Sequence, residues 1–173
     1  QIFNPVNFNY ILVSHPNLRQ PVQGEDPVQA YADYRASVEG GQYKVLMMEM
    51  EQVYQRFGYG DRTPLALRNL AGYFVQNNAD VKAMFLLGKG LTINNRLNAA
   101  YWPANYIPTF GTPASDNAFT IGLGEPGKTV VFPVGRLAAL SPRQVHDYLR
   151  KVKETEAFRY DDLWKKNVFH ISG

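Results

Sequence analysis

The chain has 173 residues, of which 45% are hydrophobic and 19% charged, a composition that fits one globular domain and excludes a disordered segment. The net charge of +3 arises near the C-terminal end, where basic residues alternate with acidic ones. We therefore expect no unbroken basic surface and no nucleic-acid partner. The apolar stretches are too short for a membrane span, and the absence of cysteine excludes disulfides, thiolate metal sites and a cysteine nucleophile within these residues.

Short apolar runs alternate with helical patterns along the chain. In chain order, the sequence predicts a strand at 10–14, a helix from Pro27, a strand at 44–49, an amphipathic turn at 51–58, a helix from Pro64, a strand at 83–88, a hairpin around 124–128, a helix from Pro142 and a strand at 167–172. The strands are continuous apolar runs, which is typical of strands buried on both faces of a parallel sheet.

The three predicted helix starts share one pattern, in which a side chain with a capping oxygen precedes proline. These pairs are Asp26-Pro27, Thr63-Pro64 and Ser141-Pro142. The oxygen can accept a hydrogen bond from an unpaired amide of the first turn, and proline at the first helical position loses no hydrogen bond.

A different pattern interrupts the alternation of strands and helices. The runs AFTIGL and TVVFPVG flank residues 124–128 and predict an antiparallel hairpin, whose returning strand Pro133 confines to an edge or to a strand end. The predicted fold class is α/β: a doubly wound, mainly parallel sheet of about four strands, with helices on both faces and this hairpin at one edge.

The segment 89–117 contains three prolines and no clear period. A loop of this length inside a compact domain usually has a function or is covered by a partner.

Candidate site residues follow from the rule that ligands bind beyond the carboxyl ends of parallel strands. His15 follows the first strand, Lys89 follows the third, and His170 lies late in the last; Asp116 precedes the hairpin and is expected to join them. With Ser14, these residue types could form a hydrolytic Ser-His-Asp group. Ser14 lacks the G-x-S-x-G elbow, however, and a structural role is favoured for this set. The two separated histidines make no zinc-binding pair, so no metal site is predicted.

Several segments, in the right order, resemble the gingipain-type cysteine peptidases, which include the signal peptidase (sortase) of the type IX secretion system. YILVSHP resembles their opening strand, and MFLLGKG resembles their third strand. NYIPTF and SDNAFTIGL resemble the segment before their hairpin. VFPVGRLAALSPRQVHDYLRKVKETE resembles their Gly-Arg-hydrophobic motif and the capped helix that follows, and LWKKNVFHISG resembles the strand leading into the catalytic half.

The resemblance implies that this chain is the first, non-nucleophilic subdomain of a caspase-like architecture. Residues 1–163 would form that subdomain, and residues 164–173 would form a strand leading into a catalytic subdomain that carries a Gly-His-Gly histidine and the cysteine. Because neither motif occurs here, no catalytic residue is assigned. The expected partners are that catalytic subdomain and a polypeptide substrate, and the expected location is secreted or at the cell surface. Gln1 at the start, without a leader, fits a mature or excised piece.

One departure bears on function, because Lys89 stands where the family usually has aspartate after Leu-Leu-Gly. No cofactor is expected, and the calcium that the resemblance allows is disfavoured by this change. The lysine also motivates an alternative, a non-catalytic binding or assembly module at the cell surface. A small-ligand-binding α/β domain that uses its strand ends is a third hypothesis.

Overall fold

The computed structural model describes residues 3–92, 95, 98–124 and 129–158. Its centre is a four-stranded parallel sheet. The strands are β1 (Tyr10–Ser14), β2 (Val45–Glu49), β3 (Ala83–Leu87) and β4 (Val134–Leu137), in the order β2-β1-β3-β4. Tyr10 lies opposite both Val45 and Ala83, so β1 has a parallel neighbour on each side. This confirms the predicted α/β class and its mainly parallel sheet.

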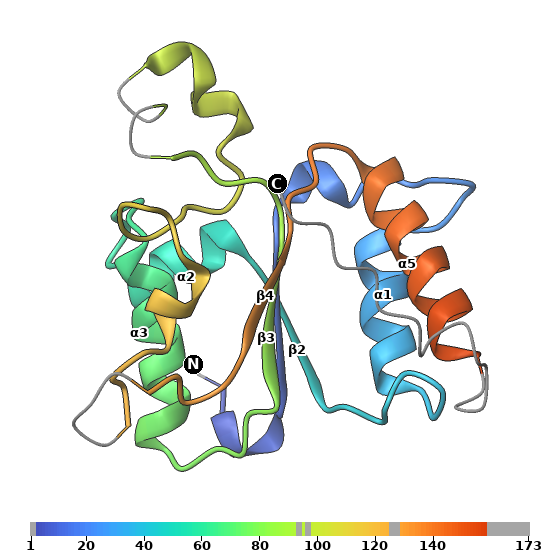
Figure 1. The fold of residues 1–173 in the computed structure, drawn as a ribbon, viewed down its shortest axis with the longest axis horizontal. Helices are drawn as coiled ribbons and strands as arrows, with labels where there is room; N and C mark the ends of the chain where they lie inside the picture. The colour runs from blue at the N-terminus through green and yellow to red at the C-terminus, as the bar shows by residue number, and fades with distance from the viewer. Residues whose placement is uncertain (1–2, 93–94, 96–97, 125–128, 159–173) are drawn as a thin grey trace, which may run out of the picture.

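Helices cover both faces of the sheet, as Figure 1 shows with the sheet seen close to edge-on. They are α1 (Pro27–Ala36), α2 (Met50–Phe57), α3 (Leu65–Gln76) and α5 (Pro142–Glu156). Short 3₁₀ turns complete the chain: η1 (Pro5–Asn7), η2 (Pro16–Leu18), η3 (Ala99–Ala104) and η4 (Asp116–Phe119). The helices α2 and α3 pack on one face, and α1 and α5 pack on the other.

Each face of the sheet has its own core, because successive strand residues point to opposite faces. Along β1, Ile11 and Val13 join the core under α2 and α3, whereas Tyr10 and Leu12 join the core under α1 and α5. Ile11, Leu12 and Val13 are fully buried. Burial on both faces explains why these strands are continuous apolar runs.

The predicted antiparallel hairpin is not confirmed. Among the described residues of that region, one isolated antiparallel bridge joins Ile121 to Val130. The chain then passes Pro133 and enters the sheet as β4, parallel to β3, with the Pro133 carbonyl accepting from the Met84 amide at 3.0 Å. The fourth strand of the sheet therefore begins with the last two residues of the predicted returning strand and continues to Leu137. The strand predicted at 167–172 and the boundary at 164 lie outside the described residues.

The helix-start pattern is correct at two of its three positions. Asp26 Oδ1 accepts from the amides of Val28 at 2.9 Å and Gln29 at 3.2 Å, and Ser141 is the N-cap of α5. The prediction for Thr63 is wrong: α3 begins one residue later than expected, its N-cap is Pro64, and no side chain caps it. Proline has no side-chain oxygen that could accept from the amides of the first turn, so this helix begins without a side-chain cap although Pro64 has helical backbone angles.

Candidate functional site at the carboxyl ends of the strands

The parallel strands end together at one edge of the sheet, and a single segment covers that edge. Residues 105–110, called the edge segment below, run beside the residues that follow β3. The Lys89 carbonyl accepts from the amides of Tyr106 at 2.9 Å and Ile107 at 3.1 Å. Ile107 is fully buried, so the edge segment is anchored by apolar packing as well as by backbone hydrogen bonds.

The close approach of the edge segment requires glycine on the strand side. A Cβ atom at Gly90 would lie 2.5 Å from Thr109 Cγ2 and 2.7 Å from the Ile107 carbonyl oxygen. Gly88 has a φ of +150°, and a Cβ atom there would lie 3.0 Å from side-chain atoms of both Tyr106 and Ile107. The Gly-Lys-Gly sequence after β3 is therefore explained by packing.

Arg136, in β4, holds the edge segment in place through hydrogen bonds of its guanidinium group. Its guanidinium makes a bidentate ion pair with Asp116, with both N–O distances 2.8 Å. It also donates to the carbonyls of Gly88 at 2.8 Å, Ile107 at 2.9 Å and Pro108 at 3.1 Å. All five guanidinium N–H groups are thus used. The side chains of Arg136 and Asp116 are 11% and 20% exposed, so this pair holds strand, loop and η4 together largely out of water.

His15 lies on the other side of the edge segment, stacked on Tyr106. The two rings are 4.2 Å apart at their centroids and nearly parallel, at 7°. His15 Nδ1 accepts from the Asn17 amide at 3.2 Å, which assigns the proton of the neutral imidazole to Nε2. Burial lowers the pKa of His15 below its ordinary value; Glu49 opposes this shift and Arg62 adds to it. The imidazole is therefore neutral at physiological pH.

A cavity of about 650 Å³ opens beside this stack, at the ends of β1 and β2. Its lining combines aromatic rings with groups that can form hydrogen bonds: His15, Pro16, Glu51, Tyr54, Arg62, Trp102, Asn105 and Tyr106. We call it the strand-end pocket. Its volume is in the range of small-ligand sites, and its position is the one that open parallel sheets use for ligands.

Tyr54 presents an unusual polar group to the strand-end pocket. Its side chain is only 7% exposed, and its hydroxyl forms no hydrogen bond with any residue that the structure describes. Burial raises the pKa of the phenol to about 12, so the group is an uncharged hydrogen-bond donor at neutral pH.

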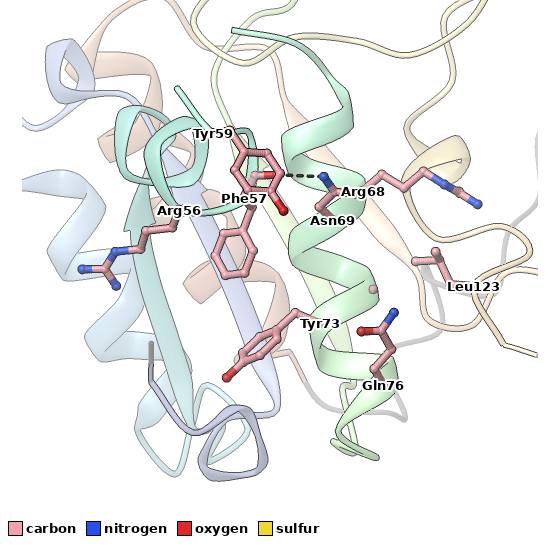
Figure 2. A pocket seen from close by; sticks show the side chains of 9 residues that line it. Arg56, Phe57, Tyr59, Arg68, Asn69, Tyr73, Gln76 and Leu123 are labelled. Atoms are coloured by element: carbon pink, nitrogen blue, oxygen red, sulfur yellow. Dashed lines mark hydrogen bonds between the residues drawn. The ribbon is translucent and has the colours of Figure 1, made fainter. Parts of the chain in front are cut away.

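A second hollow lies on the outer side of α2 and α3, as Figure 2 shows. It has a volume of about 380 Å³ and is lined by residues of these two helices, by Tyr59 between them and by Leu123. Two of its polar side chains hold the surrounding backbone: Arg68 donates to the carbonyls of Ala118 and Ile121, and Asn69 donates to the Phe57 carbonyl at 2.8 Å. Since it lies away from the strand ends, the strand-end pocket is the better candidate for a functional site.

Comparison with known proteins identifies the family. The sequence profile of peptidase family C25 matches residues 4–173, nearly the whole chain. The chain belongs to peptidase family C25. This is the gingipain family that the sequence resemblance indicates.

A solved structure supports the same C25 assignment at the level of the fold. The crystal structure of dimeric latent PorU from Porphyromonas gingivalis superposes with a TM-score of 0.71 at 22% identity. The match covers 92% of this chain but 16% of the PorU chain, so the chain spans a small part of that protein. The caspase-like α/β architecture is confirmed by this likeness. No match was found among curated protein sequences.

The structure does not unite the candidate site residues of this C25 chain into a catalytic group. His15 lies in the strand-end pocket, Asp116 is paired with Arg136, and Lys89 contributes backbone hydrogen bonds. No hydrogen bond or ion pair among the described residues joins these three side chains to one another. Ser14 is fully buried and its hydroxyl has no partner there, so it is not positioned by His15. His170 lies outside the described residues.

Three residues of the site were not predicted from the sequence. Arg136 belongs to the Gly-Arg motif, which indicated the family but no structural role. Tyr106 belongs to NYIPTF, a segment that indicated the family and lay in a long loop but predicted no role for the tyrosine. Tyr54 fits the apolar period of α2, and nothing in that period shows that its hydroxyl faces a pocket.

Two kinds of feature are absent from the described part of the chain. None of its helices is long and apolar enough to cross a membrane. No group of three or more His, Cys, Asp or Glu side chains within it is arranged to hold a metal ion.

Proposed function

We propose that this chain is the N-terminal subdomain of a gingipain-like cysteine endopeptidase, in which it supports the catalytic subdomain and forms one wall of the substrate cleft. The observation that carries the proposal is the C25 match over residues 4–173 by a chain without cysteine. A thiolate nucleophile with its imidazole must then come from another part of the protein. The chain alone is inactive, and the substrate of the parent is a polypeptide.

In this proposal, the edge of the sheet at the carboxyl ends of the strands forms the wall of the substrate cleft. The edge segment is fixed by the Arg136 hydrogen bonds and by close packing against Gly88 and Gly90, which makes it rigid enough to position a neighbouring subdomain or a bound chain. The strand-end pocket opens on the same edge. Either proteolysis or the processing of secretion signals fits this arrangement, and both place the parent outside the cell or on its surface.

Peptidase assays on two proteins test the proposal. Residues 1–173 and the full-length parent are each incubated with casein, with and without iodoacetamide. We expect no turnover by residues 1–173, and turnover by the parent that alkylation of its thiol abolishes. Measurable turnover by residues 1–173 alone would overturn the assignment of a supporting role.

A non-catalytic binding or assembly module at the cell surface is the second candidate. The Lys89 departure favours it, because the family usually has an acidic group at that position. The sequence of the parent after residue 173 separates the two candidates. A Gly-His-Gly motif followed by a cysteine favours the peptidase, and the loss of both, together with an inactive parent, favours the module.

A further inference from the structure

The strand-end pocket combines three features of a binding site. It has a stacked aromatic platform made by His15 and Tyr106, with centroids 4.2 Å apart. The Trp102 ring, at the mouth, is 61% exposed. Inside the pocket, Tyr54 is 7% exposed as a residue, and its hydroxyl is reachable from the cavity and has no hydrogen-bond partner among the described residues. A hydroxyl that faces a pocket and makes no hydrogen bond within the described protein is free to donate to an acceptor on a ligand.

The donors in the pocket indicate what the ligand must offer. Tyr54 contributes a phenol O–H, and His15 contributes the Nε2–H that remains after Nδ1 accepts from Asn17. The one cation, Arg62, is already paired with Glu51 at 2.9 Å, so a fully charged anion gains little here. The matching ligand group is a neutral acceptor, such as a main-chain carbonyl oxygen.

The walls of the strand-end pocket indicate which chemical group of the ligand lies next to the carbonyl acceptor. Because the two rings stack on each other, a third ring can meet only an outer face of the pair, and that flat π face favours an aromatic ring over a branched aliphatic group of the same volume. A cavity of about 650 Å³ is large enough for an aromatic side chain with its adjoining main chain.

We propose that the strand-end pocket binds an aromatic residue of a polypeptide, with the ring on the His15–Tyr106 platform and a main-chain carbonyl accepting from the Tyr54 hydroxyl. The choice of a polypeptide rests on the proposed function; the aromatic ring with an adjoining carbonyl rests on the pocket alone. The pocket thereby gives the protein a preference for aromatic residues in the chain that it engages.

Binding of small blocked amides to residues 1–173 tests this directly. The probes are N-acetyl-phenylalanine amide and N-acetyl-cyclohexylalanine amide, which differ in the π system, and chemical shifts are followed by NMR. We expect the aromatic amide to bind with a dissociation constant on the order of 1 mM, shifting the Trp102 indole N–H, and the cyclohexyl amide to bind several-fold more weakly. Equal affinities would overturn the aromatic preference.

Matched variants test the role of the hydroxyl. Tyr54→Phe should raise the dissociation constant for the aromatic amide about 3- to 10-fold, because it removes one hydrogen bond. Tyr59→Phe makes the same change at a tyrosine that is 97% exposed and outside the pocket, and should leave binding unchanged. The thermal midpoint of Tyr54→Phe should stay close to that of the wild type, because the hydroxyl has no hydrogen-bond partner among the described residues.

These outcomes are independent of peptidase activity. Unchanged affinity in Tyr54→Phe would overturn the inference even if the parent proved to be a peptidase. Aromatic binding that depends on Tyr54 would support it even if the parent had no turnover.

Discussion

Arg136 shows how one side chain can organise a whole edge of the sheet. Its bidentate pair with Asp116 joins β4 to η4, and its three carbonyl acceptors lie after β3 and in the edge segment. Lysine keeps the charge but offers three donors from a single nitrogen, so it cannot reach all of these acceptors.

We expect Arg136→Lys to lower the free energy of unfolding by about 2–4 kcal/mol, because it leaves largely buried carbonyls and a carboxylate without their donors. Arg150→Lys is the matched control: Arg150 is 55% exposed and pairs with Glu154 one turn away on α5, so its loss should be below about 0.5 kcal/mol. Urea unfolding measures both. Equal effects of the two variants would contradict the role assigned to Arg136.

A second prediction for a single residue concerns His15, which makes the stability of the folded protein depend on pH. Its folded-state pKa is lowered, chiefly by burial, so the unfolded chain binds a proton more readily than the folded one. The contribution of His15 to stability is therefore complete above the ordinary value of 6.5 and is lost as pH falls from there toward the lower folded-state pKa.

The measurement is the thermal midpoint at pH 7.5 and pH 5.5. In His15→Asn, which keeps an acceptor for the Asn17 amide, the drop between the two pH values should be smaller than in the wild type. A wild-type drop that survives in His15→Asn would show that other groups cause it.

At the scale of elements, the first turns of α1 and α3 distinguish a real cap from an apparent one. Asp26 accepts two amides of the first turn of α1 and also pairs with Arg19 at 2.7 Å. We expect Asp26→Ala to lower the free energy of unfolding by about 1–2 kcal/mol. Thr63→Ala, at the same position before proline, should change it by less than about 0.5 kcal/mol, because Pro64 occupies the cap position of α3. Chemical denaturation of both variants checks the contrast, which similar losses would contradict.

At the scale of the whole molecule, the two cores share the same strands. Leu12 in β1 faces α1 and α5, and Leu86 in β3 faces α2 and α3; both are fully buried. We expect Leu12→Ala and Leu86→Ala each to lower the free energy of unfolding by about 2–5 kcal/mol. Because neither face can lose its core without disrupting strands that the other uses, the loss should appear in one cooperative transition. Far- and near-ultraviolet circular dichroism should give the same midpoint, whereas separate midpoints would show that the faces unfold independently.

The sequence by itself determined the strands β1, β2 and β3, the helix starts at Asp26 and Ser141, and the family, because each depends on residues that are neighbours along the chain. Only the tertiary structure decided that the segment after Pro133 joins the sheet as a parallel strand, since β3 supplies the hydrogen-bond partners that local sequence cannot reveal. It also decided which polar groups work together. Asp116 forms its ion pair with Arg136, twenty residues away in the sequence. Tyr54 and Tyr106 come from distant segments and line the same pocket. Hydrogen bonds and burial are fixed by distances in space, and separation along the chain does not encode those distances.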